Sequence, residues 1–414
     1  MDRRTLLFRK WYYYLYLALA FAIPLYDRLV VLMIILLFIL WVAEGRFKER
    51  FRRAWQEKER RIILSFSILY IVYALGLIYS GNLEYGLFDM QVKLSLLIFP
   101  LFLATSPEGF LSQKQILHIS YSFIFSCIII TLIALVLATQ NYLYSHTFIE
   151  YYYDNLSDFQ HPSYFSMNLN FAISLIIILL IRMWTSLARG FRTFLIILIP
   201  YFFTMVILLA SKAGIISLLI LLLVSLASLI LYKKEYVIGL IFVLLVPFAF
   251  VGAYYLFPSS FYRLTIAKNY LDGHTPLNLD SGDGTNDRIL VWRSSVEVFR
   301  EHPVCGVGTG DVKDVLMEKY RENQILAAMT KRLNAHNQYL QTLVALGLIG
   351  LLILSLMLLL PAISAIRKNN LLYLLFLLLV GINFLGESML ERQAGVVFYS
   401  FFNTLLLYIH IRKQ

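Results

Sequence analysis

The chain has 414 residues, of which 60% are hydrophobic and 15% are charged, with a formal net charge of +11 and a mean hydropathy of +0.72. Soluble domains carry about 45–50% apolar and about 25% charged residues, so this composition excludes an ordinary soluble protein and indicates that lipid surrounds most of the chain. The two cysteines, Cys127 and Cys305, offer neither a disulfide framework nor a metal-binding set.

Twelve apolar stretches approach the length of about 20 residues that a membrane-spanning helix needs. They are expected near 7–25, 28–44, 62–80, 87–105, 115–138, 164–182, 194–210, 213–232, 236–257, 337–360, 371–386 and 394–411. The fourth stretch contains Asp89 and Lys93, whose spacing suits an i, i+4 ion pair on a helix. The sequence therefore predicts an all-α polytopic membrane protein of about 12 transmembrane helices.

The basic residues predict the orientation of these helices. If the N-terminus lies in the cytoplasm, 22 of the 36 basic residues fall on the cytoplasmic side, and the densest group lies between Arg46 and Arg61. The positive-inside rule then places both termini in the cytoplasm. We expect the membrane to be a bacterial inner membrane. Topology and contact with anionic membrane lipids account for the positive charge, so no nucleic-acid partner is expected.

This topology divides the chain into three parts. Residues 1–257 hold the first nine transmembrane helices, residues 258–335 form one large periplasmic loop, and residues 336–414 hold the last three helices. The apolar residues between Asp287 and Glu301 recur at helical spacing, and a second, polar helix is expected at about 311–331.

The glycine run Gly306–Gly310 lies between the two helices expected in the loop. It has neither the strand–loop–helix context nor the following lysine of a phosphate-binding loop. The run is therefore not interpreted as a nucleotide site.

Four polar residues in or beside apolar stretches are candidates for a functional site. His336 lies at the junction of the loop and the tenth span; imidazole transfers protons near neutral pH, although a helix cap or a headgroup contact is an equally simple role. Lys212 lies between two apolar stretches on the outer side, where it either extends toward the headgroups or serves a site. Arg288 lies in the large loop, where an arginine is either simply solvated or part of a site. Glu387 borders an apolar stretch and therefore needs a partner for its charge.

These residues belong to a pattern that resembles the O-antigen ligase and O-antigen polymerase family of bacterial envelope glycosyltransferases. The family motif His-(Asn/Ser/Gln)-x9-Gly-x-x-Gly is matched by His336, Asn337, Gly347 and Gly350. The preceding Arg-x3-Trp and Pro-x-x-Gly-x-Gly-x-Gly motifs are matched by residues listed here in order: Arg288, Trp292, Pro303, Gly306, Gly308 and Gly310. The family's Ser-Arg-small-Gly junction is present as Ser211–Gly214, with Lys212 in place of arginine, which keeps the charge but loses the bidentate fork.

The resemblance implies transfer of a glycan from undecaprenyl diphosphate to a sugar hydroxyl at the periplasmic face, without a metal or other cofactor. The acceptor is lipid A–core for a ligase and another glycan for a polymerase. On this basis His336 and Arg288 are expected to be catalytic. Substrate binding is expected to involve Lys212, Asn337, Lys93 and Glu387.

The preferred function is that of an O-antigen ligase-type glycosyltransferase, with a polymerase of the same fold as the first alternative. A flippase or other transporter of lipid-linked oligosaccharides is an alternative of a different class. Such a transporter is expected to show repeated halves with broken helices at matching positions, and the sequence shows no such repeat.

The topology is testable with reporter fusions. A cytoplasm-active reporter fused after Lys233 or Lys368 should give signal, whereas a reporter inserted near Gly284 should be active only in an exportable form, because the basic residues retain the first two positions inside. Reporter activity in the membrane fraction is the measurement. A cytoplasmic residue 284 would overturn the orientation.

Overall fold

The computed structural model describes residues 3–107, 109–231, 236–274, 276–279 and 284–412, and the described part of the chain contains helices and no strand. The first half contains α1 (Arg3–Ala22), α2 (Asp27–Glu44), α3 (Phe47–Gln56), α4 (Lys58–Ser65), α5 (Ile68–Gly76), η1 (Leu77–Tyr79), α6 (Leu83–Lys93), α7 (Ser95–Ala104), α8 (Gln113–Ser145), η2 (Phe148–Tyr151), α9 (Tyr153–Leu156) and α10 (Pro162–Met183). The second half contains α11 (Arg189–Leu208), α12 (Lys212–Leu231), α13 (Tyr236–Leu256), α14 (Pro258–Leu271), α15 (Gly284–Glu301), α16 (Val312–Glu322), α17 (Leu326–Lys331), α18 (Gln338–Arg367), α19 (Leu371–Gly386), η3 (Met389–Glu391) and α20 (Gln393–Arg412).

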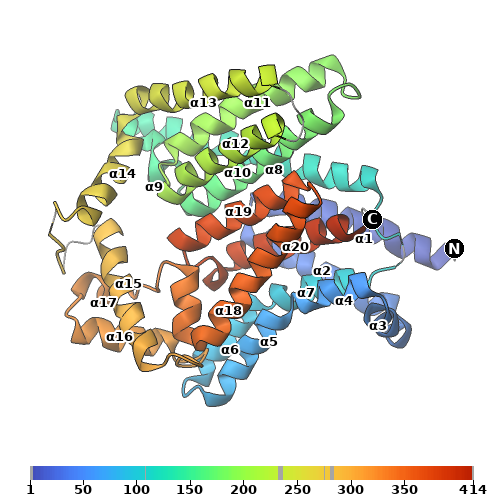
Figure 1. Cartoon of the computed structure of the whole chain (residues 1–414), viewed down its shortest axis with the longest axis horizontal. Helices are drawn as coiled ribbons and strands as arrows, with labels where there is room; N and C mark the ends of the chain where they lie inside the picture. Colours follow the sequence, from blue (N-terminus) through green and yellow to red (C-terminus); the bar gives the residue numbers. More distant parts are fainter. Residues whose placement is uncertain (1–2, 108, 232–235, 275, 280–283, 413–414) are drawn as a thin grey trace.

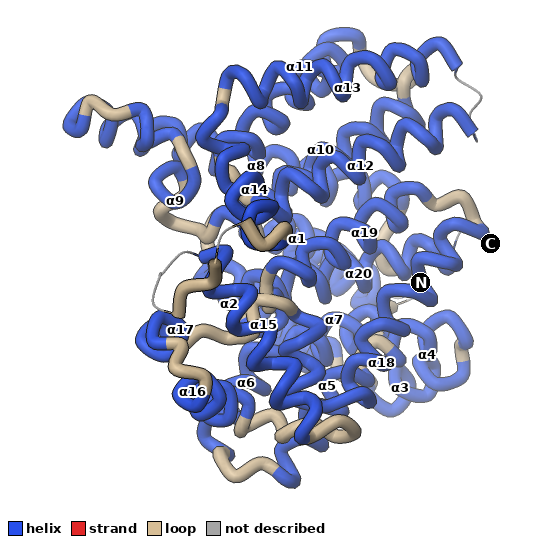
Figure 2. The backbone as a smooth tube through the Cα atoms, turned by 60° about the vertical axis from the view of Figure 1, so that its left-hand side comes forward, coloured by secondary structure: helices blue, strands red, loops and turns tan. Residues whose placement is uncertain are grey.

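The long apolar helices form a bundle with the loop helices at one end. Figures 1 and 2 show α15, α16 and α17 together on one side, with both termini on the opposite side of the bundle. In Figure 1, α14 descends from the end of α13 toward α15 and so joins the bundle to the loop helices. Helix α10 is the most enclosed apolar helix, since 89% of its most apolar 18 residues are buried inside the molecule.

Among the described residues, eight helical segments are long and apolar enough to cross a membrane, and α2 with α3 makes a ninth if the pair, bent by 101°, is counted as one. The all-α multi-pass architecture expected from the sequence is therefore confirmed. The count of twelve stays a prediction. Helix α1 is not among these segments and α19 is shorter than a full span. The ninth expected span begins directly after residues 232–235, which are outside the described part of the chain.

The glycine run attaches the loop to the membrane helix α18. Gly347 has a φ of +60° inside α18, which breaks the helix and leaves carbonyls free to accept from the loop. Val307 N donates to Val344 O at 2.9 Å and Gly308 N donates to Ala345 O at 3.0 Å. A Cβ at Gly306 or Gly347 would collide with the backbone of the other segment, so both positions need glycine.

The prediction of one continuous loop helix at about 311–331 is wrong, because this stretch forms two helices, α16 and α17. The break falls at Gln324, whose φ of +55° is left-handed and incompatible with a continuous helix. The Asn323 side chain supports the break by donating to Ser294 Oγ at 3.0 Å and to Glu297 Oε2 at 2.8 Å on α15. The other expected loop helix is confirmed as α15, three residues longer at its start.

A buried ion triad lies where α6 meets the turn between α19 and α20. Lys93 Nζ contacts Asp89 Oδ1 at 2.5 Å, as the i, i+4 spacing predicts, and also Glu391 Oε1 at 2.8 Å. The Lys93 side chain is fully buried, and its ammonium lies 4.7 Å from the ring centre of Tyr73. The triad therefore joins helices that are distant in sequence.

Replacing Lys93 by methionine should strongly destabilise the protein, because two buried carboxylates lose their cation; breaking a buried pair typically costs about 3–5 kcal/mol. The measurement is thermal unfolding of the purified protein. A matched control is Arg321→Ala, which removes an exposed pair with Glu318 and should cost less than about 1 kcal/mol. Equal effects of the two variants would contradict a structural role for the triad.

Candidate functional site

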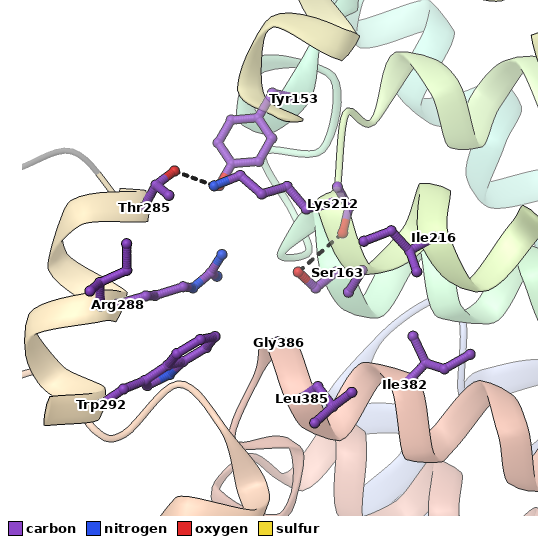
Figure 3. Close-up of a pocket in the computed structure, with 13 residues that line it drawn as sticks. Tyr153, Ser163, Lys212, Ile216, Thr285, Arg288, Trp292, Ile382, Leu385 and Gly386 are labelled. Atoms are coloured by element: carbon purple, nitrogen blue, oxygen red, sulfur yellow. Dashed lines mark hydrogen bonds between the residues drawn. The ribbon is translucent and has the colours of Figure 1, made fainter. Parts of the chain in front are cut away.

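A cavity of about 240 Å³ opens between the loop helix α15 and the ends of α12 and α19 (Figure 3). We call it the Lys212 cavity. Its walls are Tyr153, Ser163, Ser211, Lys212, Ala213, Ile216, Thr285, Arg288, Ile289, Trp292, Ile382, Leu385 and Gly386. Two of these described lining residues are cationic and none is acidic, so the cavity favours an anionic group beside an apolar wall.

Helix periodicity places one wall of the cavity. Thr285, Arg288 and Trp292 are spaced three and four residues apart on α15, so their side chains share one helix face. Figure 3 shows the three side chains extending from that helix toward α12 and α19. The Arg-x3-Trp motif therefore reflects two residues that line the same cavity.

Lys212 forms the opposite wall. It is the first residue of α12, and the N-terminus of a helix itself favours anions through free N–H groups and the helix dipole. Its Nζ donates to Thr285 Oγ1 across the cavity (Figure 3), and Ser211 donates to Ser163 at 3.4 Å. The cavity wall thus includes a lysine at the start of a helix, and such an arrangement suits a phosphate-type group.

Glu387 connects the cavity to His336. One carboxylate oxygen binds Arg288 in an ion pair, and the other lies 3.0 Å from His336 Nδ1. The Glu387 side chain is only 8% exposed. Three residues from the loop helix, the loop end and the α19–α20 turn therefore meet in one cluster, which we call the Glu387 cluster.

The charge state of Glu387 determines which ring nitrogen of His336 can accept a proton from a substrate. Burial alone would raise the pKa of Glu387. The hydrogen bond from His336 and the charge of Arg288 outweigh burial and lower the pKa to about 2. An ionised carboxylate only accepts hydrogen bonds, so Nδ1 of His336 carries the proton that it shares. In a neutral imidazole this leaves Nε2 unprotonated and able to accept a proton from a substrate.

His161 is a second imidazole near this cluster that the sequence did not single out for a role. It precedes α10, and its Nδ1 accepts from Ser163 N at 3.3 Å. Burial lowers the pKa of His161, and Glu387, Arg288 and His336 all contribute to its electrostatic environment. Its neighbour Ser163 lines the Lys212 cavity.

The structure brings together four of the six expected site residues: Lys212 and Arg288 in the cavity wall, and Glu387 and His336 beside it. Asn337 is adjacent to His336 but acts as the N-cap of α18, accepting from Tyr339 N at 2.9 Å and Leu340 N at 3.1 Å. Lys93 is not among the lining residues and binds two carboxylates instead.

The sequence did not identify Tyr153, Ser163 and Thr285 as cavity residues, because only the fold brings them beside Lys212. Glu391, which the sequence did not single out for a role, is buried against Lys93. No group of three His, Cys, Asp or Glu side chains arranged for a metal ion occurs in the part of the chain that the structure describes.

Residues 194–355 match the family model described as O-antigen ligase. This part of the chain is similar to the O-antigen ligase family. The matched residues include Lys212, Arg288 and His336, and the resemblance inferred from the motifs is confirmed. No curated protein matches the chain. The match supports an O-antigen ligase- or polymerase-type function for this multi-pass membrane protein.

The low pKa of Glu387 predicts how the cluster responds to acid. A carboxyl whose folded-state pKa lies below its ordinary value of 4.5 stabilises the fold above pH 4.5, and this contribution is lost as the pH falls toward 2. The Tm difference between the parent and Glu387→Gln should therefore be constant from pH 8 to pH 5 and shrink below about pH 4.5. A difference that vanishes already at pH 6 would show that the carboxylate is not held ionised by its partners.

Proposed function

We propose that the Lys212 cavity and the Glu387 cluster form the active site of an O-antigen ligase-type glycosyltransferase. The protein would transfer a glycan from undecaprenyl diphosphate to a sugar hydroxyl of lipid A–core, at the periplasmic face of the inner membrane. The observation that carries this proposal is the cavity between Lys212 and Arg288, with His336 joined to Arg288 through Glu387.

The two cations serve the leaving group. When the lipid diphosphate departs, negative charge develops on its oxygens, and fixed cations in a site of low polarity stabilise that charge strongly. Lys212 and Arg288 extend from opposite walls, so a diphosphate between them would contact both. The apolar side chains Ile216, Ile382 and Leu385 line the same cavity and suit the start of a lipid chain.

His336 serves the acceptor. The acceptor oxygen forms a bond to the anomeric carbon while the bond from that carbon to the diphosphate oxygen breaks. The electron pair leaves with the diphosphate, and the hydroxyl proton passes to Nε2 of His336. Glu387 keeps the other ring nitrogen protonated and so orients the imidazole for this role.

A polymerase would use the same steps with a second glycan as the acceptor, and the products distinguish the two. In a strain that lacks the gene, lipopolysaccharide gels should lose the whole O-antigen ladder while lipid-linked glycan accumulates. A single O-antigen unit on lipid A–core would instead identify a polymerase.

Substitutions should separate the roles of the charged residues. His336→Ala should leave the lipid-linked donor bound while transfer falls by roughly 10²–10⁴-fold, as for loss of a general base. Lys212→Ala should weaken donor binding, whereas Lys212→Arg should keep it, since the charge remains. The measurements are donor binding and transfer by purified protein at matched amounts.

The matched control is His302→Ala, which removes an exposed histidine from the same loop and should leave transfer at the parental rate. Transfer at the parental rate by His336→Ala would remove the histidine from the mechanism. Family membership would be unaffected by that result.

A further inference from the structure

A second cavity, of about 480 Å³, adjoins the Lys212 cavity. We call it the Tyr152 cavity. It lies between the short helical segments that follow α8, the turn before α12, and the start of α14. Tyr153 lines both cavities, and Ala210, in the wall of the second, is two residues from Lys212. The two cavities are therefore neighbours that share a side chain.

The chemistry of the Tyr152 cavity differs from that of the Lys212 cavity. Its described lining residues include the aromatic rings of Phe148, Tyr152 and Tyr153, the polar side chains of Asp154 and Asn155, and no cation. Such a surface does not favour a phosphate. It suits a neutral ligand with C–H faces for the electron-rich ring faces and hydroxyl groups for the carboxylate and amide.

A saccharide has both properties, because the C–H bonds of a pyranose ring gather on its faces and its hydroxyls project from its edge. The volume is also suitable, since small-molecule sites are typically about 300–1,000 Å³. The Tyr152 cavity is larger than the Lys212 cavity. It therefore has room for a group that the Lys212 cavity does not hold.

The backbone at the junction of the cavities is held in an unfavourable conformation. Tyr153 has a φ of +51° and Ala210 a φ of +46°, in the left-handed region that residues other than glycine rarely adopt. Such conformations persist only where the surrounding structure enforces them, and they cluster at ligand sites. Here they orient the shared wall between the two cavities.

We propose that the Tyr152 cavity binds a sugar unit of the donor glycan, next to the diphosphate. This inference rests on the proposed function of the Lys212 cavity. Figure 3 shows the Tyr153 ring beside the Lys212 side chain, so a glycan that extends from a diphosphate at Lys212 meets Tyr153 first. The donor is favoured over the acceptor because Tyr153 and Lys212 line one cavity, whereas His336, to which we assign the acceptor, is joined to that cavity only through Glu387 and Arg288.

The alternative role for these aromatic side chains is anchoring at the membrane surface, where tyrosine is common. Tyr144 provides a matched control, because it precedes the same segment, is 89% exposed and does not line the cavity. An anchoring role predicts similar effects of Tyr144→Ala and Tyr152→Ala. A sugar site predicts an effect of Tyr152→Ala alone.

The experiment measures binding of two probes to the full-length protein in lipid nanodiscs: bare undecaprenyl diphosphate and the lipid-linked glycan extracted from the source cells. Tyr152→Ala should weaken binding of the lipid-linked glycan by about tenfold and leave binding of the bare lipid unchanged. Asp154→Ala, at an exposed position of the same wall, should give the same selective loss. Tyr144→Ala should bind both probes as the parent does.

Equal weakening for both probes, no weakening, or the same effect from Tyr144→Ala would each overturn the sugar site. These results leave the proposed function standing if the parent binds both lipids and Lys212→Ala weakens both. A parent that binds neither lipid would overturn the proposed function, and the sugar site with it.

Discussion

The carboxylate of Glu387 holds Arg288 and His336 at the same time, and the arrangement of the site depends on this interaction. A buried carboxylate without partners is costly, so the cluster stabilises the contact between the loop and the membrane helices only while both partners are present. The turn that carries Glu387 makes further contacts: Asn337 N donates to Ser388 Oγ at 3.2 Å, and Leu390 N donates to Gln338 Oε1 at 2.7 Å. Four residues after Glu387, Glu391 binds Lys93 of α6. A turn of five residues thus joins the loop, α18 and α6.

The sequence predicted much of this site because its signals were local. An ionisable residue in an apolar stretch needs a partner, and that argument alone drew attention to Lys212, Lys93 and Glu387. Spacing predicted the Lys93–Asp89 pair and the helix that carries Arg288. The motifs then indicated that residues far apart in sequence, Arg288 and His336, serve one site.

The rest depended on contacts that no local pattern encodes. Glu391, the second carboxylate partner of Lys93, is 298 positions away in the chain. Glu387 is 99 positions from its partner Arg288. The break between α16 and α17 contains no glycine or proline, and side-chain bonds from Asn323 to α15 support it. Likewise, no pattern in the sequence connects Tyr153 with Lys212, and only the fold brings both residues into the wall of one cavity.

The glycine in the middle of α18 has a mechanical consequence. The part of α18 before Gly347 accepts backbone hydrogen bonds from the glycine run of the loop. The part after Gly347 donates to the loop, beginning with Leu348 N to Pro303 O at 2.9 Å. The segment that starts with His336 is therefore attached on three sides, to the loop, to the α19–α20 turn and to its own helix. Any movement of the loop away from α18 would therefore have to break backbone hydrogen bonds on both sides of Gly347.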